Sequence, residues 1–591
     1  MSERRVYELC LRLKSPFLFQ GTVNSRLGYD AAALRDENGS PAIPGTQVKG
    51  VLRAALEAMV GAGYAGLEVP RLFGGASQSI DDEFDIPDRG AARFGDLAAV
   101  APGEARPVTR IAIDRETGSV ATGAMQIVEL AAPPGEVVDF TGTLVVHYED
   151  GVDPKGVEAA IGKALKLIPS IGAAKSAGFG ETVPEGCTLV ERESERRALV
   201  PASPAPLSGD RLAFEVTFDR PIMVDAYRAD HNIYKGSTIV PGAAFKGALA
   251  ERLRIGGTDP SRVALGQILG QTLGQTLAQT RFSHAFPVDG AGQQLDLPIP
   301  FSMIAGPDIG EFADIASWQT GDAPLWGDDV PEFVSSAKDR VKECAREALG
   351  LPATSLQRLQ RTHVAIDAES LAAEEGRLYS TELLVTSGMK WRLELDFANA
   401  ADKGQAARIA AAIGDRVDGI GRTAATAMLT PADPGGIAPE PGETLTFCLV
   451  TPAVMFDGAV QDGSTMGERY ATYFRDCLGG AVLENFFAKR KLAGGYLATR
   501  YRPYGKTYHP FVLTRAGSVF RLRLASEAAR KAAGRALRFG LPVPEIGGRK
   551  VDWRTCPFVP ENGYGEARTD LHGRAAAHPD DLVAVRAADV C

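Results

Sequence analysis

The stretch Pro41-Ala-Ile-Pro44-Gly45-Thr-Gln-Val-Lys49-Gly50-Val-Leu-Arg53 decides how the chain is organised, because a second copy of it follows. The second copy, residues 239–252, reads Ile-Val-Pro-Gly-Ala-Ala-Phe-Lys-Gly-Ala-Leu-Ala-Glu-Arg. In both copies a lysine stands five residues after the proline of the Pro-Gly pair. An X-Pro pair is extended, the glycine permits a tight turn, and the Ala/Leu-rich residues after it predict a helix. The recurrence of such a pattern indicates a duplicated domain.

The start of each predicted helix is a candidate phosphate site. The first amides of a helix have no partner inside it, and the helix dipole favours an anion there. Lys49 and Lys246 add a cation to the first turn. A lysine at this place commonly lays its stem along the helix and keeps its charge in water. The recurrence of the Lys-Gly pair favours contact with a phosphate backbone.

Length and composition favour several globular domains. A chain of 591 residues is too long for one core, and 45% hydrophobic with 23% charged residues is typical of folded, water-soluble proteins. No apolar run is long enough to cross a membrane, and the N-terminus enters directly into a strand pattern, so we expect a cytoplasmic protein without a membrane partner. Seven scattered cysteines and seven scattered histidines, with no CxxC or HxxxH, disfavour a disulfide framework or a zinc site.

Charge is distributed unevenly along the chain. A net charge of −10 speaks against a free-standing nucleic-acid binder. Residues 489–523, however, contain nine Lys or Arg residues, no acidic residue, and several interleaved tyrosines. Aromatic rings stack on bases and arginines hold phosphates, so this segment, with Arg502 and Lys506, is a candidate RNA-binding surface. A strand pair with a solvated basic face is the open alternative.

The order of predicted elements recurs around both copies of the motif. An alternating strand pattern precedes each Pro-Gly helix, and a Thr-x-x-Ala-Ile-Asp sequence, an apolar strand, an Ala-rich helix and a glycine-rich loop follow it. The glycine-rich loops are residues 171–180 and 413–422. This order is the split βαβ pattern of a ferredoxin-like domain. We therefore predict an α+β fold of tandem ferredoxin-like (RRM-type) domains, two complete and one diverged.

Composition also suggests the boundaries of these units. Pro- and Gly-rich segments mark two linkers, and a longer spacing in the second unit indicates an insertion. The third unit repeats the opening strand but lacks the Pro-Gly/Lys-Gly helix. The predicted parts are unit one at 1–198, a linker at 199–209, unit two at 210–430 with an insertion about 255–355, a linker at 431–443, and unit three at 444–591.

Several short stretches of the chain share the pattern of a known family. In unit one they are Leu34-Arg35-Asp36, Ile43-Pro44-Gly45, Lys49-Gly50 with Arg53, Arg71-Leu72-Phe73-Gly74, Arg93-Phe94-Gly95-Asp96, Ile113-Asp114-Arg115 and Gln126-Ile127-Val128-Glu129. With them, residues 1–190 resemble the RAMP superfamily of CRISPR-associated proteins, and within it the target-RNA-cleaving backbone subunit of type III effector complexes. Through Ile239–Lys246 and Ala516-Gly517-Ser518-Val519-Phe520, residues 205–591 resemble the two-RAMP subunit of type III-D systems that caps the 5′ handle of the guide RNA. The chain thus resembles a fusion of the two.

This resemblance implies a catalytic residue. In the backbone family an aspartate in the loop before the Pro-Gly helix is needed for cleavage of target RNA, and Asp30, fourteen residues before Pro44, occupies that place. Its carboxylate would act as a base for the 2′-hydroxyl or hold a weakly bound Mg²⁺ or Mn²⁺. Taken alone, Asp30 reads as a turn residue, and Asp36 reads as part of a hairpin turn. Unit two offers Asp225, Asp230 and His231 in the equivalent loop, while the same count leads to Tyr227. We expect that unit to bind RNA without cleaving it.

The resemblance also implies partners and RNA contacts. Guide RNA would run along the sheets and the glycine-rich loops, paired with target RNA, next to other type III subunits that include a polymerase/cyclase-type large subunit. The expected RNA-binding residues are Lys49, Arg53, Lys175, Ser176, Lys246, Arg422, Arg502 and Lys506. Two alternatives stay open: a scaffold that binds guide RNA without cleavage, and a RAMP endonuclease that matures precursor guide RNA. The lack of a persuasive catalytic histidine argues against the second.

Overall fold

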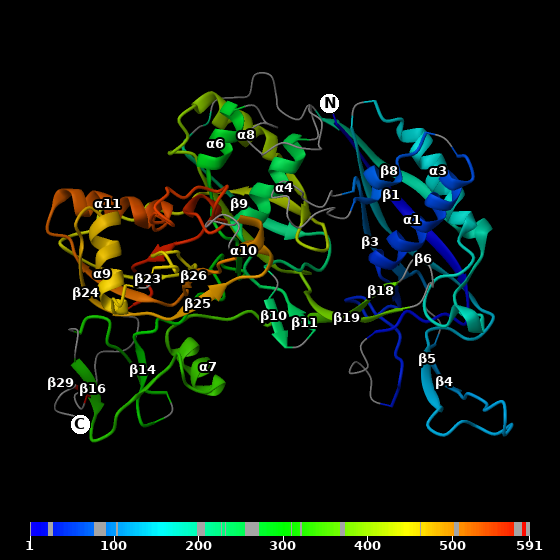
Figure 1. Cartoon of the computed structure of the whole chain (residues 1–591), viewed down its shortest axis with the longest axis horizontal. Helices are drawn as coiled ribbons and strands as arrows, with labels where there is room; N and C mark the ends of the chain where they lie inside the picture. Colours follow the sequence, from blue (N-terminus) through cyan, green and yellow to red (C-terminus); the bar gives the residue numbers. More distant parts are fainter. Residues whose placement is uncertain are drawn as a thin grey trace.

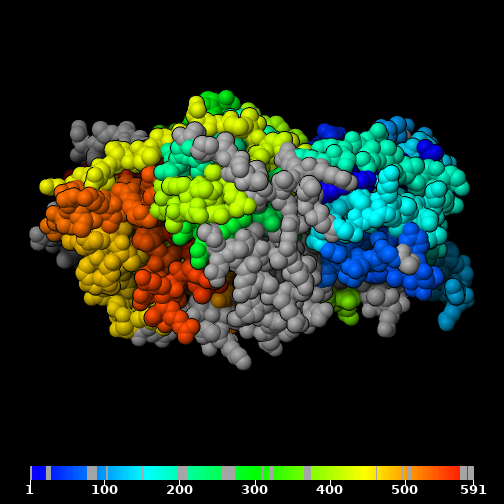
Figure 2. Space-filling model, turned by 90° about the horizontal axis from the view of Figure 1, so that it is seen from above, coloured from blue at the N-terminus to red at the C-terminus, as the bar shows by residue number. Residues whose placement is uncertain are grey.

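The computed structural model places the three units in a row. Figures 1 and 2 show the N-terminal part, coloured blue to cyan, at one end of the molecule and the orange C-terminal part at the other. The structure describes residues 2–21, 28–64, 66–75, 90–101, 104–149, 151–197, 207, 209–225, 227–230, 232–254, 271–308, 310–318, 322–366, 373–460, 462–501, 508–572 and 582–586.

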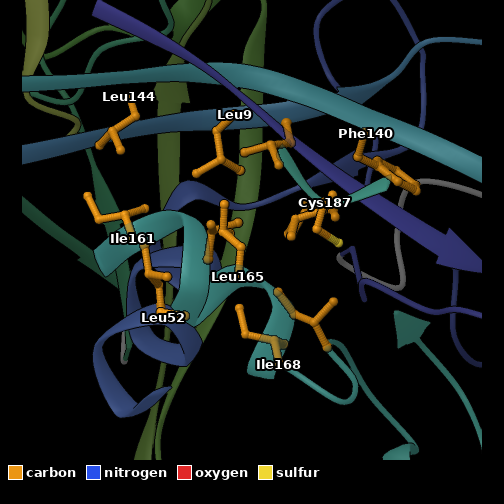
Figure 3. Close-up of a cluster of buried hydrophobic side chains, with 14 of the residues drawn as sticks. Leu9, Leu52, Phe140, Leu144, Ile161, Leu165, Ile168 and Cys187 are labelled. Carbon is orange, nitrogen blue, oxygen red and sulfur yellow. The ribbon is translucent and has the colours of Figure 1, made fainter. Parts of the chain in front are cut away.

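Unit one contains a sheet covered on one face by two helices. Its elements are β1 (Ser2–Lys14), β2 (Ala42–Ile43), α1 (Gly45–Gly61), α2 (Val69–Phe73), β3 (Ala92–Ala99), β6 (Val137–Tyr148), α3 (Pro154–Leu167), β7 (Glu181–Thr182) and β8 (Thr188–Arg197). The sheet runs β2-β3-β6-β1-β7, and β8 also pairs with β1. Leu52 of α1 and Ile161 and Leu165 of α3 pack on Leu9 and Leu144 of the sheet (Figure 3). The alternating pattern of β1 is therefore that of a half-buried strand.

Unit two has the same arrangement. Its elements are β9 (Arg211–Phe218), α4 (Gly242–Arg254), α6 (Gln271–Gln279), β12 (Arg281–Phe282), β13 (Phe286–Val288), β20 (Lys390–Asp396), α8 (Lys403–Ile413), β21 (Arg416–Ile420) and β22 (Ala425–Ala432). The sheet runs β12-β20-β9-β22-β21. Helix α4 occupies the place that α1 has in unit one, so both copies of the motif do form the start of a helix.

Unit three contains a third sheet with two helices. Its elements are β23 (Thr444–Leu449), α9 (Met466–Cys477), β24 (Val482–Phe487), β25 (Arg490–Ala493), α10 (Tyr496–Tyr501), β26 (Phe511–Thr514), β27 (Val519–Arg523), α11 (Glu527–Phe539) and β28 (Ala567–Arg568). The sheet runs β24-β27-β23-β28. A helix, α9, thus follows the first strand here too, but it begins with a capping box between Thr465 and Glu468 instead of a Pro-Gly turn.

The predicted mixed α/β architecture is confirmed at this level. In each unit the first strand lies in the interior of an antiparallel sheet. One of its neighbours there comes later in the chain than the first helix: β6 in unit one, β20 in unit two and β27 in unit three. This arrangement is compatible with RAMP-type ferredoxin-like folds. The division into two complete domains and one diverged domain, with the boundaries given above, stays a prediction.

Each of the first two units extends a β-hairpin away from its sheet. The hairpin strands are β4 (Arg106–Arg110) and β5 (Gln126–Leu130) in unit one and β18 (Arg358–Ile366) and β19 (Ala373–Leu384) in unit two. Figure 1 shows β4 and β5 projecting from the body of the molecule. The Thr-x-x-Ala-Ile-Asp repeat lies at corresponding places, because Thr109 faces Ile127 and Thr362 faces Ser380. Unit two adds two short strands beside its hairpin, β10 (Tyr227–Asp230) and β11 (Ile233–Lys235).

The insertion of unit two packs on unit three. It contains β14 (Met303–Ala305), β15 (Phe312–Asp314), β16 (Asp322–Trp326), β17 (Glu332–Phe333) and α7 (Asp339–Ala348). Met303 and Leu349 share a buried cluster with Cys448 and Val519 of unit three. Strand β29 (Leu582–Arg586), near the C-terminus, pairs with β16. The second and third units are therefore interlocked. Within the described ranges, no helix combines the length and the hydropathy that a bilayer crossing requires.

Candidate functional site

Asp30 lies at the base of the hairpin of unit one. Its backbone N–H donates to the carbonyl oxygen of Ile127 at 2.8 Å, and the N–H of Ile127 donates to Asp30 Oδ2 at 2.6 Å. Ala31 forms a parallel bridge with Val128. The Asp30 side chain is exposed, and its Oδ1 accepts no hydrogen bond within the described part of the chain. One carboxylate oxygen is thus anchored and the other faces solvent.

Glu129 fixes the loop that carries Asp30. This side chain is 0% exposed; its Oε2 accepts from the N–H of Ala33 at 3.0 Å and its Oε1 from Arg35 Nη2 at 2.6 Å. A buried carboxylate is stable only when it is paired and hydrogen-bonded, and both conditions hold here. The loop that follows Asp30 is therefore tied to β5 by side-chain contacts as well as backbone contacts.

The described residues around Asp30 do not form a metal site by themselves. Nowhere in the described ranges do three His, Cys, Asp or Glu side chains gather in a way that could hold an ion. Asp30 offers a single free carboxylate oxygen, whereas Mg²⁺ takes six oxygen ligands. An ion at this place would need most of its ligands from water or from a bound phosphate.

Unit two carries an isoleucine at the place of Asp30. Ala31 lies opposite Val128 on the second hairpin strand of unit one, and Tyr234 lies opposite Thr381 on the second hairpin strand of unit two. The preceding residues, Asp30 and Ile233, therefore correspond.

Counting back from the proline led to Tyr227 instead of Ile233, and the reason lies in unit one. Asp30 precedes Pro44 by fourteen residues, whereas Ile233 precedes Pro241 by eight. Unit one has an additional turn between Arg35 and Pro41, which bridge each other. The register of the hairpin therefore assigns Ile233, and not Tyr227, to the place of Asp30. That unit two binds RNA without cleaving it stays a prediction.

A carboxylate, Asp96, occupies the start of helix α1. The N–H of Gly45 donates to Asp96 Oδ1 at 2.9 Å, and Asp96 also forms a bidentate pair with Arg361 of unit two, with Nη1 at 2.8 Å from Oδ1. In unit two, the N–H of Gly242 lies 3.4 Å from His284 Nδ1, and burial lowers the pKa of His284 to about 3, so this imidazole is neutral. The expected phosphate site at the helix start is therefore filled by the protein's own side chains.

The glycine of each motif is required by close packing. A Cβ at Gly45 would lie 2.5 Å from the carbonyl oxygen of Gly95, and one at Gly242 would lie 2.1 Å from that of Phe282. Both neighbours are backbone atoms of the adjacent strand and cannot move independently. The Pro-Gly pair therefore marks where a helix meets the sheet edge, which explains why it recurs without a phosphate.

Gly45→Ala should lower the free energy of unfolding by about 1–3 kcal/mol, because the added methyl overlaps the backbone of the neighbouring strand. Gly50→Ala is the matched control: it lies in the same helix with nothing within 4 Å of its would-be Cβ, so alanine should stabilise the protein by up to about 1 kcal/mol. Thermal unfolding of both variants checks this. Equal effects of the two substitutions would contradict the packing account.

The lysines of the two motifs differ in exposure. Lys49 is half-buried, and burial, followed by the charge of Arg53, lowers its pKa. Arg53 Nε donates to Glu57 at 2.8 Å. Lys246 is buried; its Nζ lies 3.4 Å from the carbonyl oxygen of Ala278 and 5.6 Å from the ring centre of Phe282. The buried Lys246 is therefore not available to RNA on the surface of the protein, and it is not among the proposed contacts.

Lys246→Met should stabilise the protein, and by more at pH 7 than at pH 9. Burial lowers the pKa of Lys246 to about 7 in the folded chain, whereas the unfolded chain keeps that proton up to about pH 10.4. The unfolded state therefore binds more protons between these values, and wild-type stability rises with pH through this window. Denaturant unfolding at both pH values measures the difference. Lys49→Met, at the less buried lysine, should change the pH dependence less; an equal change would contradict this explanation.

The glycine-rich loops contribute exposed polar residues. Lys175 and Ser176 are exposed on a short 3₁₀ turn, residues 175–177. Arg422 is exposed, with its guanidinium 5.5 Å from the ring centre of Tyr234. Arg502 and Lys506 lie outside the described residues.

The backbone aligns the two loops differently from the sequence. The N–H of Ala173 donates to the carbonyl of Leu18, and the N–H of Arg422 donates to the carbonyl of Met223, each at 2.9 Å. The glycines before them, Gly172 and Gly421, have φ values of 108° and 68°. A Cβ at Gly172 would lie 2.8 Å from the carbonyl oxygen of Leu18, and one at Gly421 would lie 2.6 Å from that of Met223. Gly172 therefore corresponds to Gly421. The residues before Gly421 in the 413–422 stretch do not align with the 171–180 loop, because residues 416–420 form strand β21.

Two site residues were present in the motif stretches without an assigned role. Asp96 ends the Arg93–Asp96 stretch and Glu129 ends the Gln126–Glu129 stretch. Their roles, at the start of α1 and on the Asp30 loop, depend on contacts across the fold. The only signal in the sequence was a carboxylate within each motif stretch.

The comparison with protein families gives a match within unit one. Residues 10–183 match the family model of the RAMP superfamily. This confirms the resemblance of unit one to the RAMP superfamily. The RAMP match contains Asp30, Glu129, α1 and the hairpin within its bounds. No curated protein matches the chain.

Solved structures give distant likenesses. One is a chain of the type III-B Cmr-beta complex bound to cognate target RNA and AMPPnP, with 13% identity, a TM-score of 0.30, and coverage of 52% of this chain and 86% of that one. Another is a chain of the type III-B Cmr-beta complex bound to cognate target RNA, with 17% identity and a TM-score of 0.23. In the second case the match covers 33% of this chain and 60% of that one.

Proposed function

We propose that this chain is an RNA-binding subunit of a type III, III-D-like CRISPR effector complex. It holds guide RNA, pairs it with target RNA, and assembles with other effector subunits, including a polymerase/cyclase-type large subunit. Unit one cleaves the target RNA through Asp30. The observation that carries the proposal is the RAMP match over residues 10–183, with Asp30 exposed at the base of the hairpin inside that range.

The chemistry needs one base and a bent RNA backbone. The 2′-hydroxyl of the target RNA attacks the adjacent phosphorus, and its proton passes to Asp30 Oδ1. The 5′-oxygen of the next nucleotide leaves and takes a proton from water. The products are a 2′,3′-cyclic phosphate end and a 5′-hydroxyl end. Asp30 Oδ2 stays bound to the N–H of Ile127 and keeps the carboxylate in place.

A divalent cation, Mg²⁺ or Mn²⁺, belongs to this proposal as a weakly bound helper. It would supply charge neutralisation at the scissile phosphate. Because Asp30 alone cannot complete its coordination, the ion would arrive with the RNA, and no step above depends on its position. Guide-RNA contacts are proposed at Lys49, Arg53, Lys175, Ser176 and Arg422, and at Arg502 and Lys506 outside the described residues.

One observation favours a second candidate, a scaffold that binds guide RNA without cleaving. The 2.6 Å hydrogen bond from Ile127 to Asp30 is what a purely structural turn residue would also make. Cleavage of target RNA by the assembled complex, with Asp30→Asn in place, separates the two. The amide keeps an acceptor for Ile127 but cannot take up the proton. Loss of the cut supports the enzyme, and an unchanged cut supports the scaffold.

Maturation of precursor guide RNA is less well supported by the described residues. The side chain of His147 in unit one is 12% exposed, and desolvation lowers its pKa well below that of a free imidazole, which disfavours a role as a surface acid. It lies 3.6 Å from Asp418 at the contact with unit two. Incubation of the full chain with repeat RNA, with no cleavage expected, checks this point.

A further inference from the structure

Unit two has a row of aromatic rings where unit one has its carboxylate. His363 and Tyr379 face each other across the hairpin strands and stack at 4.9 Å with an interplanar angle of 16°. Tyr234 meets Tyr379 edge-on at 6.1 Å, and the Arg422 guanidinium lies 5.5 Å from the centre of the Tyr234 ring. Three rings and one guanidinium from separate segments thus form a continuous row.

The row is partly open to solvent. Tyr379 is 38% exposed and Arg422 is exposed, while Tyr234 and His363 are half-buried. His363 Nε2 lies 2.9 Å from the hydroxyl of Thr381, which is buried, so the imidazole is held in its stacked orientation. Burial lowers the pKa of His363, which keeps this ring neutral near pH 7. The exposed part of the Tyr379 ring, held in a fixed stack with His363, offers a surface on which another flat ring can stack.

The corresponding positions of unit one carry no such row. By the hairpin register and the glycine-turn contacts, His363 and Tyr379 correspond to Arg110 and Gln126. Tyr234 corresponds to Ala31 and Arg422 to Ala173. The aromatic residues are therefore specific to unit two, and they stand beside Ile233, which replaces Asp30. The two units differ in chemistry at one shared place in the fold.

We propose that this row, Tyr234, His363, Tyr379 and Arg422, binds an unpaired nucleobase of RNA by stacking, with Arg422 contacting the neighbouring phosphate. Aromatic faces accept any base, and a guanidinium adds charge attraction to the backbone. Unit two then binds RNA at the position in its fold that corresponds to the proposed cleavage site of unit one. This inference rests on the proposed function and specifies how its second unit takes part.

The test is binding of a single-stranded RNA oligonucleotide to the full chain, measured by fluorescence anisotropy over a salt series. Tyr379→Ala should weaken binding by about tenfold or more, as expected for the loss of one stacked base, with no change in the salt slope. Tyr379→Trp, which keeps a stacking face, should bind like the wild type. Arg422→Ala should weaken binding and lower the salt slope by about one phosphate contact.

Leu378→Ala is the matched control for surface exposure. Leu378 is 55% exposed and precedes Tyr379 on the same strand, so its side chain points to the opposite face. This variant should bind RNA like the wild type. If Tyr379→Ala binds as tightly as the wild type, or Leu378→Ala loses as much affinity, the stacking site is refuted while RNA binding stands. If the wild-type chain binds no RNA, the proposed function fails as well. If, in the assembled complex, a neighbouring protein subunit covers the row and RNA does not contact it, the inference is also overturned.

Discussion

With Asp30→Asn in the assembled complex, cleavage of target RNA at the position of unit one should fall by roughly a hundredfold or more. The amide oxygen can still accept the hydrogen bond from the N–H of Ile127, which is 2.6 Å from Oδ2 in the wild type. The loop therefore keeps its shape, while the group that takes the 2′-hydroxyl proton is lost. The measurement is the rate of appearance of the cut fragment on a denaturing gel.

Two further variants show whether this loss is chemical. Asp30→Ala should lose cleavage to the same extent, and affinity for target RNA should be unchanged in both variants. Asp36→Asn, in the turn whose carboxylate accepts from the N–H groups of Asn38 and Ser40, should cleave normally. A full rate in Asp30→Asn would refute the catalytic role and leave the scaffold.

Asp96→Ala should lower the free energy of unfolding by about 3 kcal/mol, because it leaves a nearly buried arginine without its partner. The Arg361 side chain is 10% exposed, and Asp96 also accepts from the N–H of Gly45 at the start of α1. One substitution thus removes an ion pair between units one and two and the acceptor at a helix start. Thermal unfolding gives the stability, and hydrogen exchange of the Gly45 amide reports the helix start.

Graded variants separate these two contributions. Asp96→Asn keeps an oxygen for Gly45 and should cost less than Asp96→Ala. In the double variant Asp96→Ala/Arg361→Met, no charge is left unpaired, so stability should recover in part. If Asp96→Ala unfolds like the wild type and the Gly45 amide keeps its protection, the account of the helix start is wrong.

Local patterns predicted the elements of the fold well. The alternating pattern before the first Pro-Gly helix predicted β1. The Pro-Gly motif predicted the starts of α1 and α4, because the residue before a proline is extended and glycine permits a tight turn. The helix of unit three was missed, since it begins with a Thr465/Glu468 capping box and carries none of the motif. The docking of the insertion on unit three depends on long-range burial, which no local pattern encodes.

Site residues could be predicted only where a motif in the sequence marks their position. Asp30 could be found from the family resemblance, but Ile233 could not be found by counting, because the turn at 36–41 changes the spacing between the units. Lys246 looked like Lys49 in sequence, yet tertiary packing buries it. The row around Tyr379 comes from four separate segments, so only the fold brings it together.

The central claim is that this chain carries guide RNA, and the most direct measurement is the sequence of the RNA that copurifies with it. The full chain, purified from its native cells at moderate salt, should retain short RNAs that share one constant segment joined to many different variable segments. In such complexes base pairing carries the specificity, so the variable part should match foreign sequences. Recovery of no RNA, or of unrelated cellular RNA fragments without a constant segment, would contradict the claim.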